Sequence, residues 1–115
     1  MIKKILVNLI NVKNSKDLGL CLNAVFDFSY PPFRDDKINW DSFNDSFRSM
    51  DTESKTFINY PDRDKIAGIH LVLENYQAMK NIDPRDKKIF EEILEDKTKK
   101  ENRYDDLDFS YEIIN

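Results

Sequence analysis

The chain has 115 residues, of which 40% are hydrophobic and 35% are charged, and this composition predicts one soluble domain, spanning residues 1–115, with a modest core. Its net charge of −4 argues against direct binding to nucleic acid and favours a basic partner protein. The single cysteine, Cys21, excludes an internal disulfide and is typical of a reducing compartment, so we expect a cytoplasmic protein.

The N-terminal stretch predicts a strand and then a helix. Residues 2–12 are rich in Ile, Leu and Val, and no apolar run in the chain is long enough to cross a membrane. Because Asn8 and Asn11 interrupt the run and no small-residue cleavage site follows, we expect a buried strand rather than a signal peptide. A helix starts at Asn14, which offers a capping side chain with an acid three residues later. The apolar stripe of this helix is Leu18, Cys21, Leu22, Val25 and Phe26.

A loop and a second helix follow. Residues 27–37 contain two consecutive prolines and several charges, which is typical of a loop. Residues 38–50 have apolar side chains at helical spacing, and Asn39 is a suitable N-cap. The stripe expected to face the core is Trp40, Phe43, Phe47 and Met50.

The middle of the chain predicts a long connection and a second strand. Residues 51–67 mix charges with little periodicity, and a short extended piece is expected at 56–60. The apolar run at 68–73 predicts a buried strand, and 76–81 predict a short helix.

The C-terminal third predicts a helix and a strand. Asp83 followed by Pro84 is a strong helix start. The charge run at 97–103 predicts a solvated helix end and loop. Residues 107–113 alternate between apolar and polar side chains, which predicts a half-exposed strand at a sheet edge.

The order of these elements predicts an α/β fold. Helical crossovers between strands imply parallel pairing. We therefore expect a three-stranded parallel sheet flanked by about four helices.

The sequence lacks the residues of most familiar catalytic and cofactor sites. Two glycines are too few for a phosphate-binding loop, and one histidine with one cysteine cannot form a usual zinc site. His70 lies in an apolar strand and Cys21 in an apolar stripe, so structural roles are favoured for both. We expect no cofactor, no metal and no enzymatic activity. Hydrolysis by carboxylates or Mg²⁺ at Asp41 and Asp45 is an alternative, because carboxylates suit hard cations.

Two acids on the second helix require an explanation. Asp41 and Asp45 lie four residues apart, a spacing at which like charges repel. At roughly 100° per residue, both point away from the apolar stripe, and Arg48 pairs with them only weakly. A solvated face and a binding face both fit these residues, and a basic partner that contacts both acids would offset their repulsion.

The run N-W-D-S-F-N-D-S-F at 39–47 resembles the second helix of the barstar family, small intracellular inhibitors of barnase-like ribonucleases. The positions that match that helix in order are Asn39, Asp41, Asn44, Asp45 and Phe47. Pro32-Phe33 resemble the Pro-aromatic pair before it, although the usual glycine is absent and residues 34–38 are slightly longer. The order of strands and helices is similar over nearly the whole chain.

The resemblance implies a role for each matching residue. In the family, the second helix and the preceding loop block the ribonuclease active site, where two aspartates meet the Arg and Lys side chains that hold RNA phosphate. By resemblance, Asp45 is the main phosphate mimic and Asp41 its partner. The other implied contacts are Asn39 and Asn44 beside the acids, Phe33 in the loop, and a third acid at Asp96, or at Glu95 if the match shifts by one residue.

The sequence therefore predicts a barstar-like inhibitor of a barnase-like ribonuclease. Its expected partner is a basic ribonuclease or related toxin protein, without direct contact to nucleic acid or membrane, and we expect a monomer when free. One alternative is an interaction or immunity module of the same fold with a partner that is not a ribonuclease. The other alternative is the hydrolase that uses carboxylates or a metal ion at Asp41 and Asp45.

Overall fold

The computed structural model describes residues 1–26, 33–34, 37–49 and 63–115. Turns of 3-10 helix are η2 (Arg63–Lys65), η3 (Tyr76–Ala78) and η4 (Lys100–Asn102). The strands and α-helices, in chain order, are β1 (Ile2–Asn8), α1 (Ser15–Phe26), β2 (Phe33–Arg34), β3 (Lys37–Ile38), α2 (Trp40–Arg48), β4 (Gly68–Glu74), α3 (Pro84–Lys97) and β5 (Asp108–Ile113).

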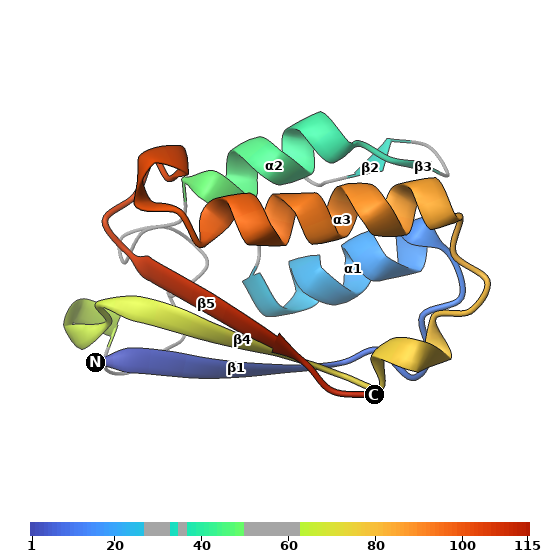
Figure 1. Cartoon of the computed structure of the whole chain (residues 1–115), viewed down its shortest axis with the longest axis horizontal. Coiled ribbons are helices and arrows are strands. Elements are labelled where there is room, and N and C mark those ends of the chain that lie inside the picture. The colour runs from blue at the N-terminus through green and yellow to red at the C-terminus, as the bar shows by residue number, and fades with distance from the viewer. Residues whose placement is uncertain (27–32, 35–36, 50–62) are drawn as a thin grey trace.

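The main sheet is parallel and has the order β1-β4-β5. The expected three-stranded parallel sheet is confirmed, and β5 lies at an edge as predicted. Figure 1 shows α1, α2 and α3 together on one face of this sheet. The three helices run side by side in the same direction, opposite to the strands, so their N-terminal ends lie at the same end of the molecule.

Strand β1 is the other edge, and this corrects the expectation of a buried strand. Ile5 and Val7 face the helices and are buried, whereas Ile2 and Leu6 are 54% and 57% exposed. The alternation follows from the pleat, because successive side chains point to opposite faces and the helices cover only one of them. The central strand β4 has neighbours on both sides, and a Cβ at Gly68 would lie 2.8 Å from the Asp108 carbonyl oxygen.

The core lies between the sheet and the helices. The stripe of α1 is confirmed, with Leu18, Leu22 and Phe26 fully buried. The helix begins as expected, because the Asn14 Oδ1 accepts a hydrogen bond from the Asp17 N–H at 2.8 Å.

The described residues contain three α-helices rather than about four. The segment expected as a short helix at 76–81 is the single 3-10 turn η3. Asn75, just before it, has a left-handed backbone with φ 58°, and its carbonyl accepts a hydrogen bond from the Ala78 N–H at 3.0 Å. The turn is tied to the sheet by the Tyr76 N–H, which donates to the Ile114 carbonyl at 3.1 Å. The residues between this turn and Pro84 form turns and bends rather than α-helix.

A small antiparallel ribbon, β2–β3, precedes α2 where a loop was expected. Phe33 pairs with Ile38 and Arg34 with Lys37. Two further expectations, the extended piece at 56–60 and the core position of Met50, lie outside the described residues. In the part of the chain that the structure describes, no helix combines the length and apolar character needed to cross a bilayer.

Candidate functional site

Helix α2 begins at a side-chain cap. Asn39 has φ −100°, and its Oδ1 accepts a hydrogen bond from the Ser42 N–H at 3.1 Å. A cap of this kind stabilises a helix by about 1 kcal/mol relative to alanine. Asp41 lies in the first turn, where the helix dipole favours a negative charge. The predicted N-cap is confirmed.

The opposite face of α2 is held in the core by aromatic packing. Phe43 and Phe47 are fully buried and stack with their ring centroids 5.4 Å apart. Phe47 also meets Phe109 of β5 edge to face at 5.1 Å. Burial of each phenylalanine stabilises the fold by about 1.5–3 kcal/mol. These contacts fix the rotation of α2 about its own axis, which determines where its polar side chains point.

Trp40 joins α2 to the starts of the other two helices. Its Nε1 donates a hydrogen bond to the Asp86 Oδ1 at 3.0 Å, and the Ser15 Oγ donates to the Asp86 Oδ2 at 2.6 Å. Asp86 lies in the first turn of α3, so one carboxylate connects the first turns of α1, α2 and α3. Asp86 could not be recognised from the sequence as a connecting residue. Its only signal was an acid in the first turn after the Asp83 cap.

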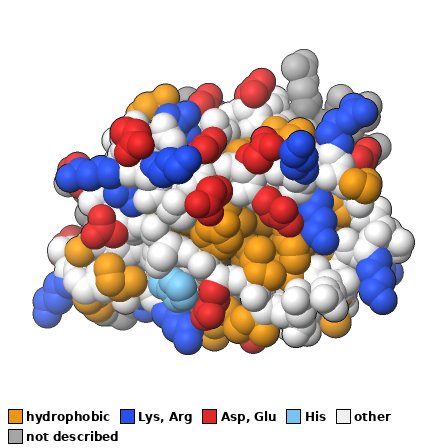
Figure 2. Space-filling view, in the orientation of Figure 1, with side chains coloured by type: hydrophobic (Ala, Val, Ile, Leu, Met, Phe, Trp, Pro, Cys, Tyr) orange, Lys and Arg blue, Asp and Glu red, His pale blue; other side chains and the backbone are white. Residues whose placement is uncertain are grey.

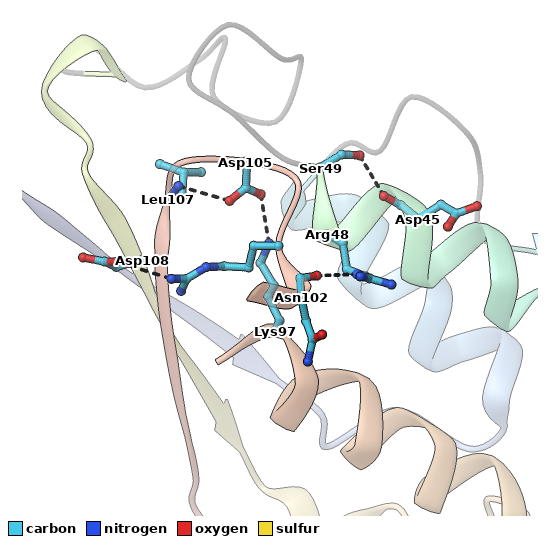
Figure 3. Close-up of polar contacts among 9 residues, drawn as sticks. Asp45, Arg48, Ser49, Lys97, Asn102, Asp105, Leu107 and Asp108 are labelled. Carbon is cyan, nitrogen blue, oxygen red and sulfur yellow. Dashed lines mark hydrogen bonds and ion pairs between the residues drawn. The ribbon is translucent and has the colours of Figure 1, made fainter. Parts of the chain in front are cut away.

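Asp41 and Asp45 are both exposed on α2. In the described part of the chain, neither carboxylate forms a hydrogen bond or an ion pair. The Asp45 backbone carbonyl accepts a hydrogen bond from the Ser49 Oγ at 2.7 Å, but the carboxylate points away from the residues packed beneath the helix (Figure 3). Asn44, between the two acids, is half-buried. The outward direction predicted for both acids is confirmed.

Arg48, the cation of α2, is occupied elsewhere. Its Nε donates a hydrogen bond to the Asn102 carbonyl, and its guanidinium lies 4.4 Å from the centroid of the Tyr104 ring. A backbone hydrogen bond also connects these two segments, because the Tyr104 N–H donates to the Arg48 carbonyl at 2.8 Å. The weak pairing of Arg48 with Asp41 or Asp45 that the sequence suggested is therefore absent among the described residues.

The structure separates the two candidates for a third acid on α3. The Glu95 carboxylate accepts a hydrogen bond from the Tyr111 hydroxyl at 2.9 Å, which directs it toward β5. Asp96 is exposed, and its carboxylate makes no such contact in the described chain. Asp96 is in the last turn of α3, which lies beside the end of α2 that carries Arg48 (Figure 1). The geometry therefore favours Asp96 over Glu95 as a side chain available to a partner.

Phe33, the remaining residue that the resemblance assigned to the site, is the first residue of β2, which pairs with β3 ahead of α2. Its backbone therefore belongs to the segment that leads into the acidic helix. Its side chain lies outside the described residues.

The end of α3 corrects the sequence-based expectation of a solvated charge run. Lys97 is fully buried, and its Nζ lies 3.0 Å from the Asp105 Oδ2, which is itself 1% exposed. Burial lowers the pKa of Lys97 and raises the pKa of Asp105, in each case against the attraction of the partner. The Lys97 ammonium also lies 5.1 Å from the Phe47 ring centroid, directly below α2. The burial of this lysine is not visible in the sequence around it, because its partner comes from the loop after η4.

The single histidine and the single cysteine lie on elements other than α2, His70 in β4 and Cys21 in α1. The His70 Nδ1 is 2.7 Å from the Ser110 Oγ, and its Nε2 is 3.4 Å from the Glu112 Oε1, on the sheet face that the helices do not cover. Burial raises the pKa of the Cys21 thiol, which makes its thiolate scarcer and favours a packing role. Across residues 1–26, 33–34, 37–49 and 63–115, no group of three or more His, Cys, Asp or Glu side chains could hold a metal ion.

An open pocket of about 510 Å³ lies at the N-terminal ends of α1 and α3. It is separate from the predicted acids of α2 and is lined by Asn14, Ser15, Lys16, Ile38, Asn81, Asp83 and Asp86. Figure 2 shows acidic and basic side chains interspersed over the helix layer. The unpaired negative charge of Asp41 and Asp45 is therefore a local feature of α2 rather than part of a uniformly acidic surface.

Comparisons of the chain with protein-family models, with curated proteins and with solved structures find no significant match.

Proposed function

We propose that the protein inhibits a basic ribonuclease of the barnase type, and that α2 blocks the active site by imitating RNA phosphates. The observation that carries the proposal is the state of Asp41 and Asp45. Both carboxylates are exposed and lack a partner in the described chain, yet they project from a helix fixed by the Asn39 cap and by the buried Phe43 and Phe47.

Such acids suit recognition of a cationic cleft. They repel one another in the free protein by a few tenths of a kcal/mol, and a basic partner that contacts both reverses that cost. Because the helix is already held in place, little conformational entropy is lost when the partner binds. Charge complementarity also accelerates the encounter, an effect for which the prototype complex of the barstar family is itself a standard example.

The proposal assigns Asp45 as the main phosphate mimic and Asp41 as its partner. Asn39 and Asn44 flank them, Phe33 belongs to the preceding segment, and Asp96 extends the site onto α3. The carboxylates act as fixed anions rather than as acid or base, so the protein has no turnover of its own. Its setting is the cytoplasm, where it binds no nucleic acid directly.

A second candidate is an interaction or immunity module of the same fold whose basic partner is not a ribonuclease. The absent loop glycine before α2 favours this alternative, because it changes the segment that leads into the helix. A carboxylate- or metal-dependent hydrolase is the weaker alternative, because no metal-binding cluster includes Asp41 or Asp45 within the described residues.

The proposal is tested by binding kinetics with barnase-like ribonucleases. Wild-type protein should inhibit at least one of them, with an association rate that falls steeply as salt is raised. The variant Asp45→Asn keeps the size of the side chain but removes its charge, and it should weaken binding by roughly 30-fold or more, as expected for a central residue of an interface. The double variant Asp41→Asn/Asp45→Asn should lose most of the salt dependence.

The matched control removes two charges from the opposite side of the molecule. Glu74→Gln/Glu112→Gln changes β4 and β5 on the face away from the helices, and it should alter the association rate far less than the α2 variant. Equal losses in the two double variants would show that net charge alone governs the encounter. Hydrolysis of RNA by the purified protein, if it required Mg²⁺ and vanished in the Asp41→Asn/Asp45→Asn variant, would replace the inhibitor proposal with the hydrolase.

A further inference from the structure

Asp45 forms no ion pair within the described residues, although a cation follows it on the same helix. Arg48 follows Asp45 by three residues, a spacing at which acidic and basic side chains pair on an exposed helix. Such a pair would neutralise the acid that the proposed function needs. In the structure the guanidinium instead contacts the Asn102 carbonyl and the Tyr104 ring.

These two contacts form a clamp that comes from the segment between α3 and β5. Asn102 supplies a backbone carbonyl, and Tyr104 supplies an aromatic face 4.4 Å from the guanidinium carbon. A guanidinium over an aromatic ring is attracted by the negative face of the ring. The Tyr104 side chain is 69% exposed, so hydrophobic burial does not explain why it lies there.

The segment that carries the clamp is held by polar contacts on both sides of Tyr104. The Lys97–Asp105 pair fixes the segment on one side of Tyr104, and the Asp105 Oδ1 accepts a hydrogen bond from the Leu107 N–H at 3.1 Å. The Arg103 guanidinium lies 3.6 Å from Asp108 at the start of β5. Figure 3 shows the contacts of Asp105 with Lys97 and Leu107 beside the end of α2. In the same view Arg48 is directed toward Asn102, and the Asp45 carboxylate is directed away from both.

We infer that Asn102 and Tyr104 sequester Arg48 and so keep the Asp45 carboxylate available to a basic partner. Tyr104 is thus a positioning residue that acts through Arg48. The inference rests on the proposed function for its role in binding, but the clamp itself can be tested without any partner.

The variant Tyr104→Ala releases one side of the clamp. Its crystal structure should show the Arg48 guanidinium within about 4 Å of the Asp45 carboxylate, the range of an ion pair. The conservative variant Tyr104→Phe keeps the ring and should leave Arg48 where it is. If Arg48 stays on the Asn102 carbonyl in Tyr104→Ala, the ring does not hold it and the inference is wrong.

Affinity for a barnase-like ribonuclease tests the consequence. In Tyr104→Ala, an Arg48–Asp45 ion pair would compete with the partner for the Asp45 carboxylate. The strength of an exposed helix ion pair corresponds to about a twofold loss of affinity. The double variant Arg48→Gln/Tyr104→Ala removes the competing cation and should regain wild-type affinity. A double variant that stays as weak as Tyr104→Ala would show instead that Tyr104 touches the partner or supports the fold, and urea unfolding of each variant separates those two causes.

Failure of the proposed function gives a different pattern. In that case no ribonuclease binds the wild type or any variant, while the position of Arg48 in Tyr104→Ala still decides whether the clamp exists.

Discussion

The variant Lys97→Met should strongly destabilise the protein. Methionine is apolar and similar in length to lysine, so it fills the space beside Phe47 but removes the positive charge. The Asp105 carboxylate would then remain 1% exposed, and among the described residues it would keep only the hydrogen bond from the Leu107 N–H at 3.1 Å. Removal of one partner of a buried ion pair costs about 3–5 kcal/mol, a large part of the roughly 5–15 kcal/mol that stabilises a typical domain.

The double variant Lys97→Met/Asp105→Asn should recover much of that loss. The asparagine Oδ1 can still accept the Leu107 hydrogen bond, and neither position of the former pair carries a charge. The pKa shifts of both groups support this, because burial disfavours the charged form of each more than their attraction favours it. Urea unfolding followed by the fluorescence of Trp40 measures both variants. Two results would refute this account, in which each charge is costly to bury and each needs the other. One is a Lys97→Met variant as stable as wild type, and the other is a double variant less stable than Lys97→Met.

Two further predictions concern stability. Phe47→Ala should destabilise the protein by about 3–5 kcal/mol, because it leaves a cavity where the ring packs on Phe43 and Phe109; a thermal midpoint equal to wild type would contradict the packing of α2. Burial and the hydrogen bond to Glu91 at 2.6 Å raise the pKa of Tyr76 well above its usual value. Above about pH 10 the Tyr76 hydroxyl loses its proton in the unfolded chain before it does so in the folded protein, so the free energy of unfolding should fall by about 1.4 kcal/mol per pH unit. Urea unfolding between pH 8 and 11 should show a smaller fall for Tyr76→Phe than for wild type.

The parts of the fold that depend on local sequence were predictable. The caps at Asn14, Asn39 and Asp83 act on backbone groups two or three residues away, so they can be recognised without knowledge of the fold. The apolar spacing of α2 likewise determined its buried face, because a helix has one fixed period. From that face the outward direction of Asp41 and Asp45 followed directly.

The features that depend on partners distant in sequence were not predictable. β1 has the composition of a buried strand, but its edge position and the single layer of helices leave Ile2 and Leu6 exposed. Each strand of the ribbon β2–β3 is two residues long, which is too short for the alternation of apolar and polar residues to show in the sequence.

By itself, the sequence determined that α2 is a helix, which face of it enters the core, and that two like charges lie together on the other face. The tertiary structure alone decided whether those charges are neutralised. Lys97 lies in a run of charges that looks solvated, yet it is buried because Asp105 returns to it eight residues later. Arg48 is close enough in sequence to pair with Asp45, yet it is held by Asn102 and Tyr104, more than fifty residues away. The physical reason is that a helix period fixes only the direction of a side chain, whereas its charge partner is set by whichever distant segment the fold brings beside it.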